Sequence, residues 1–115
     1  MNHIDEQIEN VEISLKMAKD IVARRDKLLR LYANQDFEQL ISEDYFTNEA
    51  SRLVLLMSDT EMQTPEKQAS INNSMMGIGG LRQYFQTILQ QGQMAERAIV
   101  ADEQTHAELL KEAIE

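Results

Sequence analysis

Three of the chain's four glycines, Gly77, Gly79 and Gly80, fall close together in the stretch NNSMMGIGGLRQYF. Glycine-rich loops can hold phosphate on their backbone amides, so this stretch is the first place to look for chemistry. It lacks the lysine of the GxxxxGK(S/T) loop, and the dinucleotide pattern GxGxxG would need a third glycine where this chain has Arg82. We therefore interpret the glycines as a thin part of a helix, where a second helix crosses close by or where the helix kinks.

Glu103 and His106 have the Glu-x-x-His spacing by which di-iron carboxylate bundles place two metal ligands on one helical face. Such a site needs two of these pairs and two further glutamates, whereas this chain has one pair. The sequence has no cysteine, and no serine stands in a recognisable arrangement with either histidine. The sequence therefore predicts no catalytic residues, no metal and no cofactor, and a protein that is not an enzyme.

Length and charge restrict the kinds of partner. With 115 residues the chain is long enough for one domain with a modest core. Its formal net charge of −9 argues against duplex DNA, because phosphate recognition needs clustered lysine and arginine. No apolar run approaches the roughly 20 residues of a membrane span, and the acidic start MNHIDEQIEN is unlike a signal peptide. We expect a soluble, intracellular protein without a membrane partner.

Apolar residues recur at helical spacing along the chain, while proline and glycine are scarce. A first helix is expected at about 4–32, with a heptad row from Ile4 to Tyr32 that Arg25 interrupts. A second apolar row flanks the first, so this helix is expected to need more than one partner helix. The second row comprises Ile13, Met17, Ile21, Leu28 and Leu31.

Two further helices follow. One is expected at about 36–58 with a bend near Ser42, and the other at 64–101, where Thr64 is the cap and proline takes the first turn. An acidic helical tail is expected at 102–115. The predicted fold class is all-α, in a single domain. We expect an elongated antiparallel helical hairpin or three-helix arrangement of a long helix, a bent middle helix and a long C-terminal helix, which is oligomeric.

The apolar row of the third helix keeps its phase across the glycine cluster, which a loop would interrupt. We predict that this row forms a helix crossing or an oligomer interface, since helices of such unequal length cannot cover one another fully. The predicted interface comprises Ile71, Met75, Gly77, Ile78, Gly80, Leu81, Phe85, Ile88 and Gly92. An alternative ligand site is a basic patch of Arg24, Arg25, Arg30 and Arg82.

The runs DYFTNEASRLVLLMSDTEMQTPEKQASI, IGGLRQYFQTI and MAERAI carry a resemblance to a family of small uncharacterised helical proteins of tailed bacteriophages, often encoded beside head and portal genes. It rests on Tyr45, Phe46, Glu49, Ala50, Arg52, Leu53, the run from Met62 to Pro65, Ile78, Gly79, Leu81, Tyr84, Phe85, Met94, Ala95 and Glu96. The family brings no catalytic residues to carry over. The resemblance implies a phage context, in the host cytoplasm or in the virion.

Together these observations predict a non-enzymatic helical protein that self-associates and serves as a structural or assembly component of a phage particle. Its partners would be further copies of itself and phage structural proteins. The alternative is an acidic anti-defence protein that inhibits a host defence protein or sequesters a signalling nucleotide, motivated by the net charge of −9. The charge is distributed in blocks, with a basic patch in the first helix, which argues against mimicry of DNA.

Overall fold

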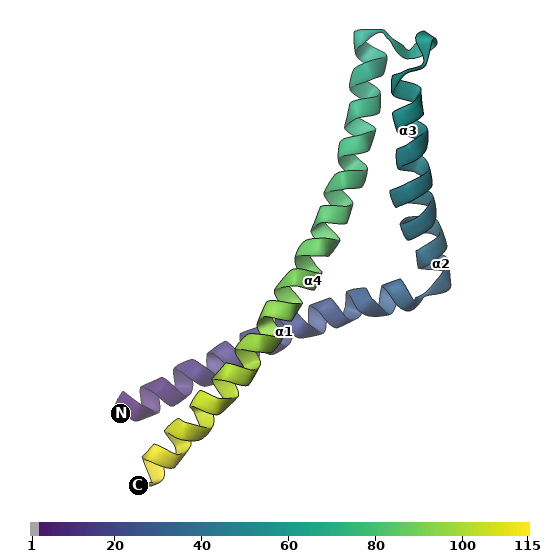
Figure 1. Ribbon diagram of the computed structural model, residues 1–115. Helices are drawn as coiled ribbons and strands as arrows, with labels where there is room; N and C mark the ends of the chain where they lie inside the picture. Colours follow the sequence, from purple (N-terminus) through teal and green to yellow (C-terminus); the bar gives the residue numbers. More distant parts are fainter. Residues whose placement is uncertain (1–2) are drawn as a thin grey trace. The chain divides into compact units, whose positions relative to one another are not determined.

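Helix follows helix along the part of the chain that the structure describes, residues 3–115 (Figure 1). In this computed structural model those residues contain no strand, so the predicted all-α fold is confirmed. The elements are α1 (His3–Ala33), α2 (Gln35–Phe37), the π-helix η1 (Glu38–Glu49), α3 (Ala50–Met57), the 3-10 turn η2 (Thr60–Met62) and α4 (Pro65–Ile114). The acidic stretch 102–115 continues α4 as far as Ile114.

Side-chain caps determine two of the helix starts. Asn34 Oδ1 accepts a hydrogen bond from the backbone N–H of Phe37 at 3.0 Å, which starts α2 directly after α1 ends. Thr64 Oγ1 accepts from the backbone N–H of Lys67 at 3.3 Å. Pro65 takes the first position of α4, where its missing N–H costs nothing. These caps separate α1 and α4 from the middle helical stretch.

The middle stretch changes from α-helix to π-helix and back to α-helix without an interruption. Ser42, where the sequence predicts a bend, lies inside the π-helix η1. Thr47 Oγ1 donates to the carbonyl of Ser42 at 3.2 Å, a bond that spans five residues as a π-turn does. The backbone is already helical at Glu49, so α3 follows without a side-chain cap. Residues 35–57 therefore form one continuous helical stretch.

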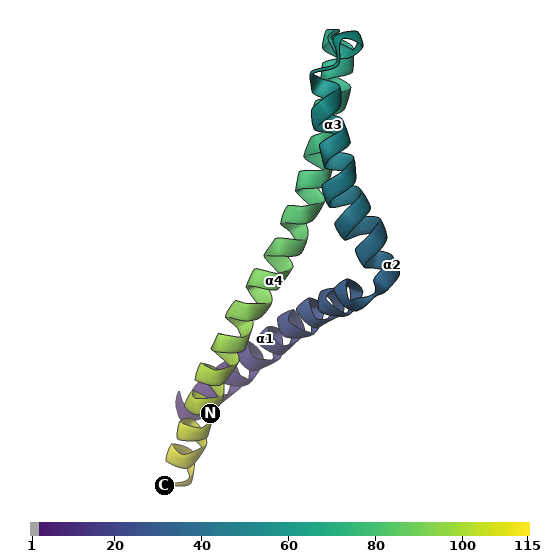
Figure 2. The ribbon, with the colours of Figure 1, turned by 45° about the vertical axis from the view of Figure 1, so that its right-hand side comes forward.

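Two glutamine side chains hold the turn between α3 and α4. Gln63 Nε2 donates to the carbonyls of Met57 at 2.9 Å and Asp59 at 2.7 Å. Gln68 Nε2 donates to the carbonyls of Met57 at 3.1 Å and Met62 at 2.7 Å. Carbonyls at the end of a helix lack intrahelical partners, and these amides supply them. The turn so held brings α3 back alongside α4 in both views (Figure 1, Figure 2).

Contacts within the chain group into two compact units. The central unit is Leu29–Thr87, and the terminal unit joins residues 3–28 to Ile88–Glu115. Because α1 and α4 each cross a unit boundary, both helices contribute to both units.

In the central unit, α3 packs on the first half of α4. Leu53 of α3 is buried against Ile71 and Ile78 of α4. Half-buried side chains surround these three: Tyr45, Phe46, Ala50, Leu56, Met57, Met62 and Met75. Burial of these aliphatic and methionine side chains is the main stabilising contribution to this hairpin.

Aromatic side chains form a second cluster in the central unit. It contains all six aromatic residues of the chain: Tyr32, Phe37, Tyr45, Phe46, Tyr84 and Phe85. The ring centroid of Phe85 lies 6.1 Å from that of Tyr32, 6.0 Å from that of Phe37 and 6.0 Å from that of Phe46. Phe85 of α4 therefore ties the end of α1 to the middle helical stretch through edge-to-face and tilted ring contacts.

In the terminal unit, α1 and the last half of α4 run antiparallel, and α1 starts at the end of the unit where α4 finishes (Figure 1, Figure 2). Ala18 and Leu28 of α1 are buried, as are Ile88 and Ala95 of α4. The heptad row predicted for the first helix is buried or half-buried from its start through Arg25. This row is therefore the seam between the two helices.

The cap at Asn34 gives a direct test of the junction between α1 and α2. Replacing Asn34 by alanine is expected to lower the free energy of unfolding by about 1 kcal/mol, because the N–H of Phe37 loses its acceptor. Asn34→Asp keeps an acceptor and should match the parent chain. Urea unfolding followed by circular dichroism, at one fixed protein concentration, measures both, and equal midpoints for the two variants would contradict the capping role.

Candidate interaction site

The glycine cluster is part of a regular helix and does not form a loop. Gly77, Gly79 and Gly80 lie inside α4, and no glycine of the described chain has a positive φ. Backbone N–H groups in the interior of a helix donate to carbonyls of the preceding turn, so none is available to cradle a phosphate. The segment therefore offers no phosphate-binding loop.

Most of the predicted interface row faces the inside of the chain. Ile71 and Ile78 are buried in the core of the central unit and Ile88 is buried in the terminal unit, while Met75, Leu81 and Phe85 are half-buried. Gly77 and Gly80 are exposed. A methyl group at Gly77 would meet only the hydroxyl of Tyr45 at 3.7 Å, and one at Gly80 would meet nothing within 4 Å. Neither glycine marks a close helix approach within the chain, so a contact of Gly80 with another chain stays a prediction.

The close approach within the chain lies at Gly92. A methyl group there would overlap the Cβ and Cγ atoms of Arg25, so the missing side chain lets α1 and α4 come together. Arg25 is the residue that interrupts the apolar seam, and its side chain is only 13% exposed. A charged residue in one row and a glycine in the facing row are the sequence signal of this contact, although the sequence alone does not pair them.

The guanidinium of Arg25 forms ion pairs with carboxylates beside the apolar seam. Its Nη2 pairs with Glu96 of α4, and its Nε pairs with Asp26 at 3.0 Å. The hydrogen bond from Arg25 lowers the pKa of Glu96 below its ordinary value of 4.5, and the attraction of the positive charge lowers it further. The pKa of Arg25 is raised, chiefly by its hydrogen bond to Glu96, with burial acting against this. Gly92 thus makes room for the stem of Arg25, and Glu96 holds its charged head.

The predicted basic patch is divided between the two units. Arg24 and Arg25 belong to the terminal unit, and Arg30 and Arg82 to the central unit. Arg25 is already engaged by two carboxylates. Burial raises the pKa of Tyr32, and the positive charge of Arg82 opposes that shift. The charge of Arg82 is therefore felt at Tyr32 in the aromatic cluster. A nucleotide would have to displace Glu96 and Asp26 to use all four arginines together.

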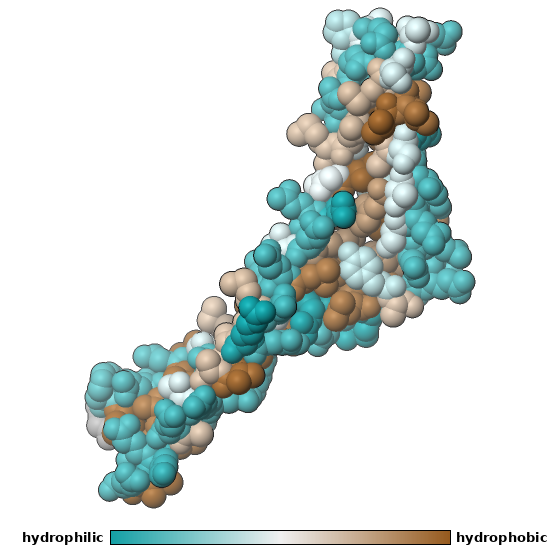
Figure 3. All heavy atoms as spheres, viewed as in Figure 1, coloured by the Kyte–Doolittle hydropathy of each residue, from teal (hydrophilic) through white to brown (hydrophobic). Residues whose placement is uncertain are grey.

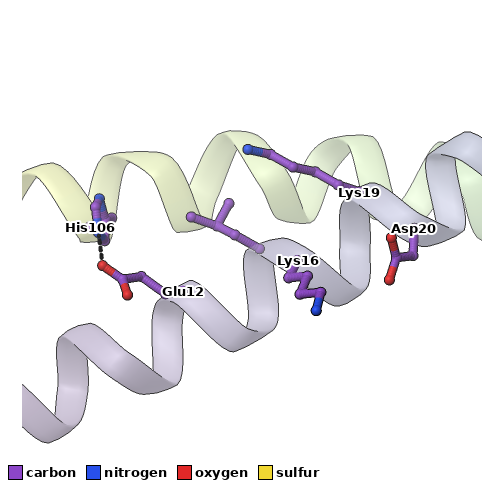
Figure 4. A pocket seen from close by; sticks show the side chains of 6 residues that line it. Glu12, Lys16, Lys19, Asp20 and His106 are labelled. Carbon is purple, nitrogen blue, oxygen red and sulfur yellow. Dashed lines mark hydrogen bonds and ion pairs between the residues drawn. The ribbon is translucent and has the colours of Figure 1, made fainter.

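A shallow groove runs between α1 and α4 in the terminal unit (Figure 4). His106 Nε2 lies 3.0 Å from Glu12 Oε1, so the histidine of the Glu-x-x-His pair contacts α1. The groove is lined by Glu12, Leu15, Lys16, Lys19, Asp20 and His106. Its charges are of both signs, which gives no preference for an anion or a cation. Within residues 3–115, no group of three His, Cys, Asp or Glu side chains could hold a metal ion.

Among the described residues, large apolar side chains are exposed more often than they are fully buried. Apolar atoms reach the surface at several places in the space-filling view (Figure 3). Among the described residues seven hydrophobic residues are buried, and no large side chain is less than 2% exposed. The exposed large hydrophobic residues are Ile13, Met17, Ile21, Leu29, Leu31, Leu40, Val54, Leu55, Met76, Tyr84, Met94, Val100, Leu110 and Ile114. Of the second row predicted on the first helix, only Leu28 is buried, so this row finds no second partner helix in the terminal unit.

No helix among the described residues is both long enough and apolar enough to cross a membrane. The exposed apolar rows are the candidate site, because contiguous apolar side chains at a protein surface are typical of interaction sites.

The fold and the exposed apolar rows together define an all-α protein of paired helices with candidate protein-binding faces. Comparison with known protein families, with curated proteins and with solved structures finds no match for this chain.

The close approach at Gly92 predicts opposite effects for two glycine replacements. Gly92→Ala is expected to lower the free energy of unfolding by about 1–3 kcal/mol, because the new methyl group overlaps Arg25 near its backbone. Gly80→Ala meets open space in a helix and is expected to raise it by up to about 1 kcal/mol. Thermal and urea unfolding of both variants measures this, and a stabilising Gly92→Ala would disprove the close approach.

The Arg25–Glu96 pair predicts a pH dependence. Since the pKa of Glu96 is lowered on folding, its contribution to stability is present above about pH 4.5 and is lost as the pH falls through the lowered value. Glu96→Gln should therefore be less stable than the parent at pH 7, and the difference should shrink in acid. Glu103→Gln on the same helix is the matched control. Unfolding curves measured from pH 7 to pH 3 test this, and a difference for Glu96→Gln that does not change with pH would contradict it.

Proposed function

We propose that this chain is a non-enzymatic protein that self-associates through its exposed apolar helix faces and serves as a structural or assembly component of a bacteriophage particle. The observation that carries the self-association is the excess of exposed over buried large apolar side chains. Fully burying one Val, Leu, Ile or Met side chain contributes about 1.5–3 kcal/mol, so covering even a few of them favours association.

The phage context rests on the resemblance of residues 28–103 to helical proteins encoded beside head and portal genes. Assembly proteins act by binding copies of themselves and other particle proteins, which requires surfaces and no catalytic residues. The exposed rows on α1, α3 and α4 are surfaces of that kind. They support the proposal because each presents large apolar side chains to solvent.

The acidic anti-defence protein is the alternative proposal, and the net charge of −9 favours it. Such a protein would use carboxylates to occupy a basic surface of a host factor. The nucleotide-sequestering form of this alternative finds less support, because Arg25 is paired with Glu96 and Asp26 and the backbone at Gly79 is inside a helix.

Two measurements test the proposed function. Light scattering on the chromatographed protein is expected to give at least twice the chain mass of 13.2 kDa, and a monomer at all concentrations would remove the self-association. Affinity capture from phage-infected cells, identified by mass spectrometry, is expected to recover particle proteins. Recovery of a host defence enzyme in their place would favour the acidic alternative.

A further inference from the structure

Phe85 of α4 contacts two rings of the middle helical stretch. Its ring centroid lies 6.0 Å from that of Phe37 in α2 and 6.0 Å from that of Phe46 in η1. All three residues belong to the central unit. Phe37 and Phe46 therefore present their rings on the same side of the middle stretch, the side that faces α4.

A continuous α-helix could not present both rings on one side. Phe46 follows Phe37 by nine residues, and at about 100° per residue an α-helix turns about two and a half times over that distance. The two rings would then point in opposite directions. In a π-helix each hydrogen bond spans five residues, so a turn takes more than four residues and nine residues complete about two turns. The π-helical geometry of η1 is therefore what allows both ring contacts.

The burial along η1 follows the same long period. Half-buried residues come in neighbouring pairs at 41–42, 45–46 and 49–50, a spacing of four residues where an α-helix has 3.6. No residue of η1 is fully buried, so the stretch has little core of its own to fix its geometry. Most π-helices in proteins are single turns, whereas this one spans 12 residues. The two rings on Phe85 are the contacts that hold it.

We propose that η1 is a conformational switch, which is π-helical while Phe85 holds both Phe37 and Phe46 and rewinds as an α-helix when Phe37 is released. The segments before and after η1, α2 and α3, are already α-helical. Rewinding therefore joins them into one α-helix without breaking the chain. The switch lies within the central unit and is independent of the proposed self-association.

Rewinding changes which side chains face the solvent. Leu53 is buried against Ile71 and Ile78, so α3 keeps its side toward α4. Counted back from Leu53 at about 100° per residue, Phe37 in the α state lies about 160° from Leu53 around the helix axis, and Leu40 about 140° from it. Both then lie on the outer face, about 60° apart. The α state thus presents an apolar pair of Phe37 and Leu40, and a partner that binds this pair favours that state.

Couplings across hydrogen bonds in the NMR spectrum test the switch, because they identify the carbonyl to which each amide donates. In the parent chain the amides of residues 43–49 are expected to donate to carbonyls five residues earlier. Phe37→Ala removes one of the two rings, and the same amides are expected to shift to carbonyls four residues earlier. The core around Leu53 is unchanged in this variant, so the hairpin of α3 and α4 should keep its fold.

Tyr32→Ala is the matched control. Tyr32 also contacts Phe85, with ring centroids 6.1 Å apart, but it belongs to α1, so both rings of the middle stretch stay on Phe85. This variant is expected to keep the five-residue pattern. Phe85→Leu removes the shared ring while it keeps an apolar side chain, and it should give the four-residue pattern. It provides the same test should Phe37→Ala not fold.

Three results would overturn the switch. One is a four-residue pattern in the parent chain, which would remove the π state. Another is a five-residue pattern, or a loss of all couplings in residues 43–49, in the variants that release the ring contacts. The third is a shift in Tyr32→Ala equal to that in Phe37→Ala, which would show that any loosening of the aromatic cluster rewinds the stretch.

Discussion

Where two helices pack as a pair, each can bury only the stripe of its surface that faces the other, and this constraint shapes the whole chain. Ala18 on α1 is buried in that stripe, while Met17, the residue before it, remains mostly exposed. A larger domain adds further helices to cover the remaining faces. In the terminal unit of this chain no described segment does so, and the apolar side chains next to the seam therefore stay in contact with water.

The start of α4 and most of the inner row of α1 could be predicted from the sequence because both depend on local signals. Thr64 before a proline marks the start of α4, and the three- and four-residue steps of the first helix identify the row that faces α4. The π-helical geometry of the middle stretch could not be predicted from such local signals. A bend near Ser42 follows from capping residues, whereas a π-helix depends on how many residues each turn takes, which no single residue type indicates.

The glycines show that sequence spacing does not identify which helix faces pair. A cluster of three suggested the closest helix approach, yet Gly77 and Gly80 lie off the inner row of α4, and a helix that is thin on its outer face brings no neighbour closer. Gly92 stands alone in the sequence and lies on the inner row opposite Arg25. Periodicity identifies the residues that share a face, but the pairing of faces is a property of the folded chain. The same limit applies to the second row of α1, whose spacing requires a neighbour without identifying it.

The contact between Arg25 and Gly92 also restricts how the two helices can slide. A heptad seam of aliphatic residues accepts a shift of seven residues at little cost, because similar side chains meet again. Here such a shift would place Phe85 or Ile99 opposite the stem of Arg25, and either side chain would fill the space that the glycine leaves open. It would also separate the guanidinium from Glu96. Arg25 and Gly92 therefore fix the register of α1 against α4, so that the long apolar seam has a single alignment.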